Sequence, residues 1–341
     1  MRYPSFIKKG DTIGFVAPSF GCATEPYKTA FDHSLEIWKQ NGYEIHLGPN
    51  CYASEGIGIS NTPEKCAEEF EQMYRDQSNV ALISCGGGEL MCEILGHIDF
   101  CALANAKPKW FMGYSDNTNM TFLLPTLTDT AAIYGPNAGA FGMEPWHESL
   151  EDTYHLLCGK NLIVHNYPLW EKESKKDEEH PLEPYHVTEP FSLKMKPMVG
   201  DVEIKGRLLG GCLDCLRNLV GTRFDRVKEF SEKYKEDGIL WFLEACDLNV
   251  MNMRCALWNL KEAGWFNHVK GFLIGRPRLY DEPMMGLDQY EAVCGALEEF
   301  GVPILMDLDI GHIAPSMPLI CGSMAHVKAT RQSIEIQMNL C

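Results

Sequence analysis

The stretch Lys107–Leu124, KPKWFMGYSDNTNMTFLL, is typical of a buried strand that ends at a serine and turns directly into a helix. The apolar run Trp110–Met112 predicts the strand, and apolar residues at helical spacing follow from Asn117 until Pro125 disturbs the pattern. A hydroxyl at such a junction lies near backbone N–H groups at the positive end of the helix, which can stabilise a developing oxyanion. Ser115 is therefore a candidate nucleophile.

The motif around this serine, GYSDN, is a relative of the GxSxG nucleophile elbow that lacks the final glycine. Serine is also an ordinary N-cap residue at the start of a helix. A purely structural role for Ser115 stays open on this evidence.

A glycine run, Gly86–Gly88, follows the apolar run VALIS. It matches neither GxGxxG nor GxxxxGK[ST], so a nucleotide-dependent oxidoreductase is a remote alternative. Glycines let the backbone approach a ligand and turn an N–H inward, which would add an oxyanion donor beside the amide of Asp116; a plain turn is the other interpretation. Cys85 could itself be a nucleophile, although a buried cysteine at a strand end is far commoner.

The first half of the chain alternates strand and helix patterns. Strands are expected in DTIGFVAPS, YEIHLGPN and VALIS, and helices over Tyr27–Gln40, over Thr62–Asp76 and through Leu95. In the second helix, Thr62 is the expected cap and Pro63 the first helical residue. Repeated βα units predict an α/β fold with a mostly parallel sheet, whose sites lie at the carboxyl ends of the strands, where the glycine run and the serine both fall.

A chain of 341 residues suits two domains. We expect an N-terminal α/β domain over 1–168 and a charged, proline-bearing linker or mobile loop over 169–197. A second domain is expected over 198–341, with short strands in DVEIKGRLLGG, strands in GILWFLEA and KGFLIGRP, and helices through CLDCLRNLVG and MNMRCALWNLKEAG.

Composition indicates which kinds of partner are unfavourable and in which cellular compartment the protein is expected. The formal net charge of −17 argues against binding to nucleic acid or to an anionic membrane, because both require clustered Lys and Arg. The sequence has no apolar run of about 18 residues and no signal-peptide pattern, and its 14 cysteines suit a reducing compartment, so we expect a cytoplasmic protein. Cys212 and Cys215 have metal-like spacing but lack a second pair, so no metal is expected.

Two residues of the second half complete a possible triad. Glu244 ends the very apolar strand GILWFLEA, where a carboxylate must be paired or hydrogen-bonded; a functional role and a structural ion pair are equal alternatives. His312 follows Gly311 in a proline loop and could be an ordinary loop histidine. With Ser115 they supply a nucleophile, an orienting carboxylate and a base.

A larger set of motifs supports one family. GDTIGFVAPS, CGGGEL, GYSDNT, IYGPN, GRLLGGCLDCL, WFLEA, FLIGRP and GHIAPSMPLICGS occur in the order and approximate spacing of the serine peptidase family that contains LD-carboxypeptidases and microcin C7 immunity proteins. The chain resembles this family over about residues 10 to 325. The resemblance implies a flavodoxin-like N-terminal domain, a smaller β-rich C-terminal domain, a homodimer, and no metal or organic cofactor.

The resemblance also implies roles for individual residues. Ser115, Glu244 and His312 match the nucleophile, triad carboxylate and base, while backbone N–H groups of Gly88 and Asp116 match the oxyanion donors. Candidate substrate-binding residues are Gly87, Glu89, Trp170 and Tyr185. Glu89 could bind a substrate ammonium or cap a helix, and the two aromatic residues could stack on a base or simply pack.

Two departures from the family pattern concern packing and substrate. Cys212 stands where the family usually has asparagine, and we expect it to alter local packing. The charged segment 170–196 varies in the family and shapes substrate choice. LD-carboxypeptidases release a D-amino acid from cell-wall peptides, whereas the immunity branch cleaves an aminoacyl group from a nucleotide analogue. The length of this chain and the long segment before GRLLGG favour the immunity branch slightly. A non-catalytic protein that binds a small ligand on the same frame is the rival class.

Overall fold

The computed structural model describes residues 1–197 and 200–341 and divides them into two compact units. The first unit comprises residues 1–161 and 173–186, and the second comprises 162–172 and 187–341. The expected linker at 169–197 is thus shared between the units, because short strands at both of its ends pair inside the second unit. Met198, the expected start of the second domain, lies outside the described residues.

The first unit is built on a parallel sheet. Its strands are β1 (Thr12–Val16), β2 (Glu44–Leu47), β3 (Ala81–Ser84), β4 (Trp110–Gly113) and β5 (Ala132–Tyr134). They lie in the order β2-β1-β3-β4-β5, and every neighbouring pair among them is parallel. This is the strand order of flavodoxin-like folds, so the expected α/β architecture is confirmed. The order reverses between β1 and β3, where the loops that follow these strands separate.

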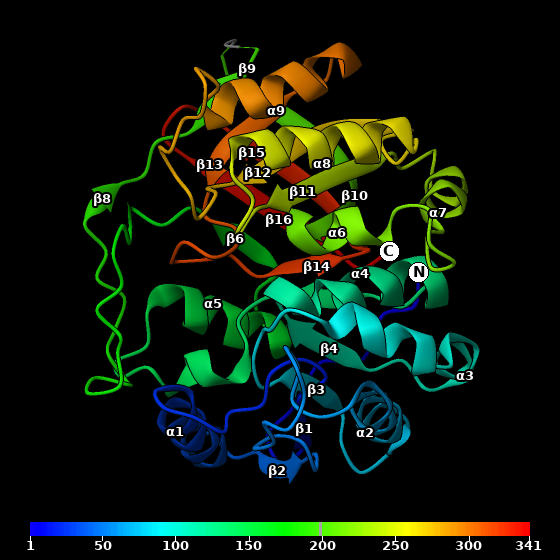
Figure 1. The fold of residues 1–341 in the computed structure, drawn as a ribbon, viewed down its shortest axis with the longest axis vertical. Helices are drawn as coiled ribbons and strands as arrows, with labels where there is room; N and C mark the ends of the chain where they lie inside the picture. Colours follow the sequence, from blue (N-terminus) through cyan, green and yellow to red (C-terminus); the bar gives the residue numbers. More distant parts are fainter. Residues whose placement is uncertain (198–199) are drawn as a thin grey trace. The chain divides into compact units, whose positions relative to one another are not determined.

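Helices cover both sides of this sheet. They are α1 (Tyr27–Gln40), α2 (Pro63–Arg75), α3 (Phe100–Asn105), α4 (Thr118–Thr128) and α5 (Glu148–Leu157), with short 3₁₀ helices η1 (Met91–His97), η2 (Ser115–Asn117) and η3 (Ala138–Gly142). Figure 1 shows α1 and α2 on opposite sides of the strands. The side chain of Thr62 accepts a hydrogen bond from the amide of Lys65, and Pro63 is the first helical residue, as expected.

Two local predictions differ from the structure. The segment through Leu95 is a 3₁₀ helix, and α4 continues past Pro125 to Thr128. Proline in a helix costs about 3 kcal/mol through the lost hydrogen bond and the clash of its ring. Nearly all of α4 is buried, including Pro125 itself, so apolar packing around the helix offsets that cost.

The second unit is built on a mixed sheet of eight strands. The strands of this unit are β6 (Ile163–His165), β7 (Leu169–Trp170), β8 (Glu189–Pro190), β9 (Lys194–Lys196), β10 (Val202–Cys212), β11 (Ile239–Glu244), β12 (Val269–Gly275), β13 (Ile304–Leu308), β14 (Leu319–Cys321), β15 (Met324–Ala329) and β16 (Ile334–Asn339). Strands β7 and β8 pair with each other, and they and β14 are not part of the eight-stranded sheet. The large sheet has the order β6-β16-β15-β10-β11-β12-β13-β9, with β10 to β13 parallel and antiparallel strands outside them. The sequence DVEIKGRLLGG, where short strands were expected, forms one long strand, β10, because it pairs with β15 along its first half and with β11 along its second.

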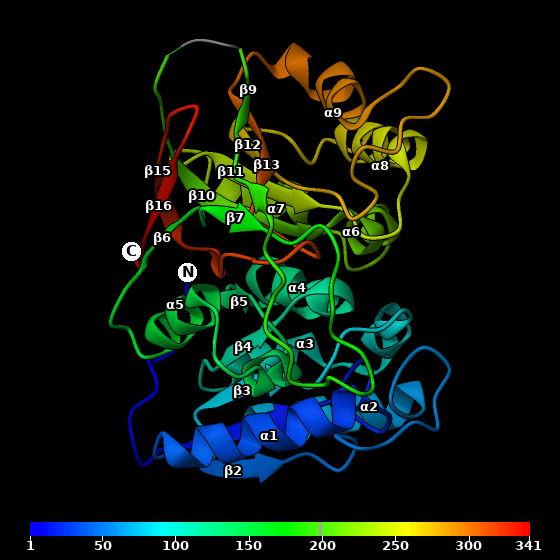
Figure 2. The ribbon, with the colours of Figure 1, turned by 90° about the vertical axis from the view of Figure 1, so that its left-hand side faces the viewer.

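The helices of this unit lie together beside its sheet. They are α6 (Leu213–Leu219), α7 (Val227–Lys233), α8 (Val250–Glu262) and α9 (Gln289–Leu297), followed by the 3₁₀ helix η4 (Glu298–Phe300). Figure 2 shows α6, α8 and α9 on one side of the strands, with β15 and β16 on the other side. Of the parallel strands, β11 and β13 are buried along their whole length, and β10 and β12 are buried from Gly206 and Gly271 onward.

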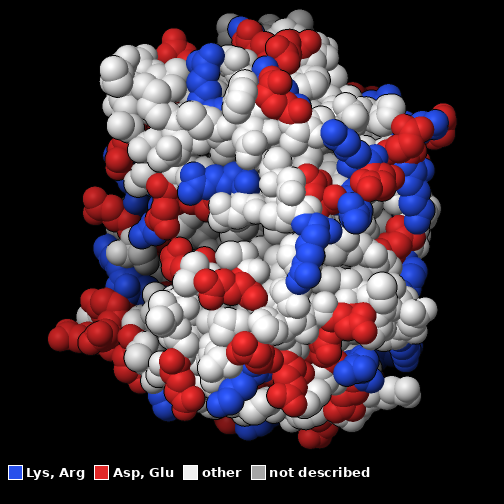
Figure 3. Space-filling model, turned by 45° about the vertical axis from the view of Figure 1, so that its right-hand side comes forward, with Lys and Arg blue, Asp and Glu red and all other residues white. Residues whose placement is uncertain are grey.

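The surface agrees with the acidic composition. On the face shown in Figure 3, Asp and Glu side chains are interspersed with Lys and Arg, so basic residues form no continuous surface there. Among the described residues, no helix is both long enough and apolar enough to cross a membrane.

Candidate active site

Ser115 lies two residues after the end of β4, in a strained backbone conformation. Its φ is +63°, which is uncommon for a residue other than glycine, and it is the first residue of η2. The N-cap positions of η2 and α4 are Tyr114 and Asn117, so the cap role that the sequence left open does not fit Ser115. A strained serine between a parallel strand and a helix is the local geometry of a nucleophile elbow.

The glycine loop after β3 packs directly against this serine. A Cβ atom added to Gly87 would lie 3.2 Å from the hydroxyl oxygen of Ser115, which places the loop backbone beside the hydroxyl. The carbonyl of Gly87 accepts a hydrogen bond from the amide of Phe20 at 2.9 Å. Because C=O and N–H of a trans peptide point in opposite directions, the N–H of Gly88 is directed away from Phe20. The role of this N–H as an oxyanion donor stays a prediction.

Asp116 joins three loops at the carboxyl edge of the sheet. Its buried carboxylate accepts hydrogen bonds from the hydroxyl of Ser19 at 2.6 Å, the amide of Met91 at 2.9 Å and the side chain of Asn119 at 3.1 Å. Burial raises the pKa of Asp116 to about 6, and these hydrogen bonds act in the opposite direction. The side chain of Asp116 therefore fixes the loops that surround Ser115.

Two asparagines hold the elbow and were not singled out from the sequence. The side-chain amide of Asn117 donates to the carbonyl of Gly86 at 2.8 Å and to the side-chain carbonyl of Asn137 at 3.2 Å. The latter oxygen also accepts from the amide of Tyr114 at 3.3 Å. Asn117 and Asn137 lie in GYSDNT and IYGPN, two of the motifs that carry the family resemblance, so these motifs could have pointed to them. Their contact could not be predicted, because it requires β4 and β5 to be neighbours in the sheet.

In the second unit, Glu244 and His312 form a close pair. Nδ1 of His312 lies 2.8 Å from Oε2 of Glu244, and the carboxylate is fully buried while the imidazole is 12% exposed. Glu244 is the last residue of β11, and His312 lies in the loop after β13. The sequence left open a functional role or a structural ion pair for Glu244. The structure shows that its buried carboxylate is paired with the imidazole of His312.

Glycine makes this contact possible. Gly311 has a φ of +105°, and a Cβ atom there would overlap the carboxylate of Glu244. The amide of Gly311 donates to the hydroxyl of Ser316 at 3.0 Å, which fixes the turn from within the same loop. The conformation that brings His312 to Glu244 therefore depends on the absence of a side chain at the preceding residue.

A buried ion pair anchors the start of the same loop. Arg276 donates to the carboxylate of Asp309 at 3.3 Å and to the carbonyl of Asp307 at 2.8 Å, and its guanidinium lies 4.4 Å from the ring centroid of Trp170. Burial raises the pKa of Asp309 to about 6, against the effect of Arg276. The sequence did not single out this pair, because its partners lie far apart in the chain.

The candidate substrate-binding residues Trp170, Tyr185 and Glu89 differ in burial and in the residues that they contact. Trp170 is buried and packs edge-on against Tyr280 at 5.4 Å between centroids. Tyr185 packs at 5.5 Å from the ring of His147 in the first unit. Glu89 is exposed and precedes Leu90, the N-cap of η1. Their roles in substrate binding stay predictions.

Cys85 is a poor nucleophile in this fold. Its thiol is buried, and burial together with neighbouring thiols raises its pKa well above the ordinary value. The reactive thiolate is therefore disfavoured at this position.

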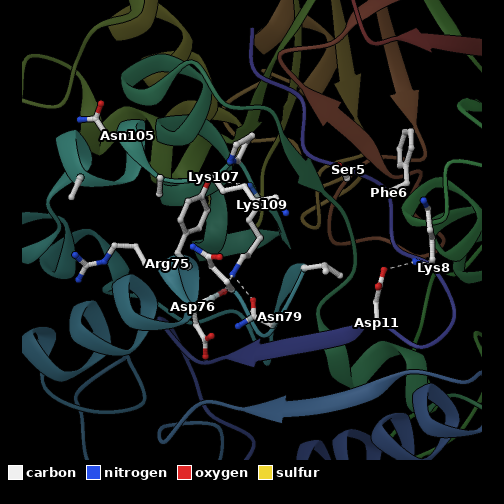
Figure 4. A pocket seen from close by; sticks show the side chains of 16 residues that line it. Ser5, Phe6, Lys8, Asp11, Arg75, Asp76, Asn79, Asn105, Lys107 and Lys109 are labelled. Atoms are coloured by element: carbon white, nitrogen blue, oxygen red, sulfur yellow. Dashed lines mark hydrogen bonds between the residues drawn. The ribbon is translucent and has the colours of Figure 1, made fainter.

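One hollow of the first unit lies away from Ser115. It measures about 690 Å³ and is lined by residues that precede β1, β3 and β4, at the amino edge of the sheet (Figure 4). Lys109 in this hollow donates to the carbonyls of Met73 and Asp76 at 2.9 and 2.6 Å, and burial lowers its pKa to about 8. Lys109 thus satisfies carbonyls at the end of α2, which is a structural role.

Comparisons with known proteins identify relatives along nearly the whole chain. Residues 13–135 match the family model for the LD-carboxypeptidase N-terminal domain, and residues 205–327 match that for the C-terminal domain. The microcin C7 self-immunity protein MccF of Escherichia coli is 25% identical over 96% of this chain and 93% of its own length. A Bacillus subtilis protein named probable murein peptide carboxypeptidase is 25% identical over 98% and 94%, respectively.

Solved structures show the same fold. A structure of MccF in complex with aspartyl sulfamoyl adenosine superposes with a TM-score of 0.81 and 23% identity, covering 98% of each chain. At this identity the likeness establishes the fold alone.

Proposed function

This chain belongs to the LD-carboxypeptidase family, and we propose that it is a serine hydrolase of amide-type bonds with Ser115 as nucleophile, His312 as base and Glu244 as orienting carboxylate. The observation that carries this proposal is the 2.8 Å contact between Nδ1 of His312 and the buried carboxylate of Glu244. A carboxylate at Nδ1 holds the proton on that nitrogen and leaves Nε2 to accept one from a serine hydroxyl.

Catalysis would proceed through an acyl-enzyme. Oγ of Ser115 attacks the substrate carbonyl while its proton passes to Nε2 of His312, and the backbone N–H groups of Gly88 and Asp116 donate to the oxyanion. His312 then gives the proton to the leaving group. Water, deprotonated by the same imidazole, hydrolyses the acyl-enzyme and regenerates the hydroxyl of Ser115.

We propose an aminoacyl nucleotide or a close analogue as the substrate. The long segment before GRLLGG supports this choice, as does the aspartyl sulfamoyl adenosine in a structurally similar protein. The relative named for murein peptides supports the second candidate, a cell-wall peptide ending in a D-amino acid. The cytoplasmic location and the homodimer stay predictions.

An active-site-directed fluorophosphonate probe tests the enzyme proposal. We expect the probe to label the wild-type protein and not Ser115→Ala, while Cys85→Ala retains labelling. Absence of labelling in the wild type, or equal labelling of Ser115→Ala, would favour the non-catalytic binding protein.

Two substrates distinguish the branches. The protein is incubated with an aminoacyl sulfamoyl adenosine and, separately, with a peptidoglycan tetrapeptide ending in D-alanine, and products are separated by mass. We expect cleavage of the former; cleavage of the tetrapeptide alone would assign the chain to the carboxypeptidase branch.

A further inference from the structure

Three different metal-ligating side chains converge in the second unit. The sulfur of Cys212, a carboxylate oxygen of Glu244 and a ring nitrogen of His312 all lie within 4.8 Å of one another. Cys212 and Glu244 are the last residues of the parallel strands β10 and β11 and are register partners, so their side chains leave the sheet side by side. The cluster therefore follows from the pairing of the strands as well as from the side-chain positions.

We propose that Cys212, Glu244 and His312 form a binding site for a thiophilic divalent cation, with Zn²⁺ as the expected ion. Thiolate sulfur, imidazole nitrogen and carboxylate oxygen are the donors that Zn²⁺ takes in proteins. Bond lengths of about 2.0 to 2.3 Å place the donors of a tetrahedral ion about 3.5 Å apart. The donors here all lie within 4.8 Å of one another, so any pair near that limit would have to close by about 1 Å to reach this spacing. Three protein ligands leave the fourth position to water.

The carboxylates around Cys212 favour a bound cation. The carboxylate of Glu244 is fully buried, and a second carboxylate lies close to the sulfur, since Oδ2 of Asp214 is 3.3 Å from Sγ of Cys212. Asp214 is held in place by the amides of Cys246 and Asp247, each at 3.0 Å. A divalent ion would compensate this concentration of negative charge in a buried place.

Binding requires no redox partner. The thiol of Cys212 releases its proton to solvent as the metal–sulfur bond forms, Glu244 binds as the carboxylate, and His312 binds through a neutral ring nitrogen. With either ring nitrogen bound, the imidazole can no longer both donate to Glu244 and accept a proton. If the proposed function holds, Zn²⁺ is therefore a reversible inhibitor of hydrolysis.

Direct metal binding tests the site without a substrate. The full chain, stripped of metal with a chelator, is titrated with Co²⁺ while thiolate-to-cobalt charge-transfer absorption is recorded, and Zn²⁺ affinity is measured by competition with a chromophoric chelator. We expect one ion per chain and a charge-transfer band. Cys212→Ala should abolish the band, and Glu244→Gln and His312→Ala should each weaken Zn²⁺ binding at least about 10-fold.

Matched controls separate this site from the other thiols. Cys101→Ser and Cys255→Ser change exposed cysteines and should leave both readouts unchanged. Cys212→Ser replaces Cys212→Ala if the latter does not fold, as judged by its unfolding curve. A band that survives loss of Cys212, or no Zn²⁺ binding at about 1 mM, overturns the proposal. Because no step needs turnover, this result is independent of whether the chain is a hydrolase.

Discussion

Replacing Gly311 by alanine is expected to separate the imidazole of His312 from the carboxylate of Glu244. The added Cβ would overlap that carboxylate, which is fully buried and lies in contact with His312. The backbone of Gly311 also has a φ of +105°, a conformation that L-amino acids with a side chain rarely adopt.

Two contributions set the size of the effect. A side chain at positive φ costs about 1–2 kcal/mol. Loss of the contact to a buried carboxylate adds about 1–3 kcal/mol, because that group would keep its desolvation cost without its partner. We therefore expect Gly311→Ala to lower the free energy of unfolding by about 2–5 kcal/mol in urea titrations. Misplacement of the imidazole should also lower turnover by about 10²-fold.

Alanine variants of two other glycines serve as controls that distinguish the cost of backbone strain from the cost of steric overlap with Glu244. Gly301 has a φ of +65° and no atom within 4 Å of an added Cβ, so Gly301→Ala should show the strain cost alone. Gly139 also has open space and lacks a positive φ, so Gly139→Ala should behave like the wild type. If Gly311→Ala unfolds at the same urea concentration as Gly301→Ala and keeps full activity, the inferred overlap with Glu244 is wrong.

The other predictions concern the loop beside Ser115, a buried glutamate, the ion pair and the triad. Gly87→Ala would place a Cβ 3.2 Å from the hydroxyl of Ser115, so we expect turnover to fall while the unfolding midpoint stays near that of the wild type; an unchanged kcat would contradict the packing of this loop. Burial raises the pKa of Glu69 from 4.5 to about 7, so the folded state binds its proton more tightly, and stability should fall by up to about 3 kcal/mol as pH rises from about 4.5 to 7. Glu69→Gln should lose that part of the pH dependence, and unfolding curves of equal pH slope would refute it. Arg276→Met leaves Asp309 without its partner and should cost about 3–5 kcal/mol, whereas the double variant with Asp309→Leu should recover part of the loss in a double-mutant cycle. Ser115→Ala and His312→Ala should each lower turnover by about 10³-fold or more with an unchanged fold, although His312→Ala should also lower the free energy of unfolding by about 1–3 kcal/mol, because it removes the partner of the buried Glu244 carboxylate. Glu244→Gln should lower turnover less, and full activity in any of the three would remove that residue from the proposed mechanism.

Local features were readable from the sequence because neighbours in the chain produce them. The elbow at Ser115 follows from an apolar strand, a tight junction and a helical pattern within one short segment. The start of α2 follows from Thr62 and Pro63 in the same way. Pro125 shows the limit of this reasoning, since the burial of α4 outweighs the local preference to end the helix.

The amino-acid sequence by itself determined the α/β class, the position of the strained serine and the candidate residues Glu244 and His312. Tertiary structure alone decided that His312 meets Glu244, that Asn117 meets Asn137, and that Cys212 stands beside the same carboxylate. The physical reason is that these contacts depend on which strands are neighbours and in which register. Strand pairing is stabilised by side chains distant in sequence, so no local pattern along the chain records it.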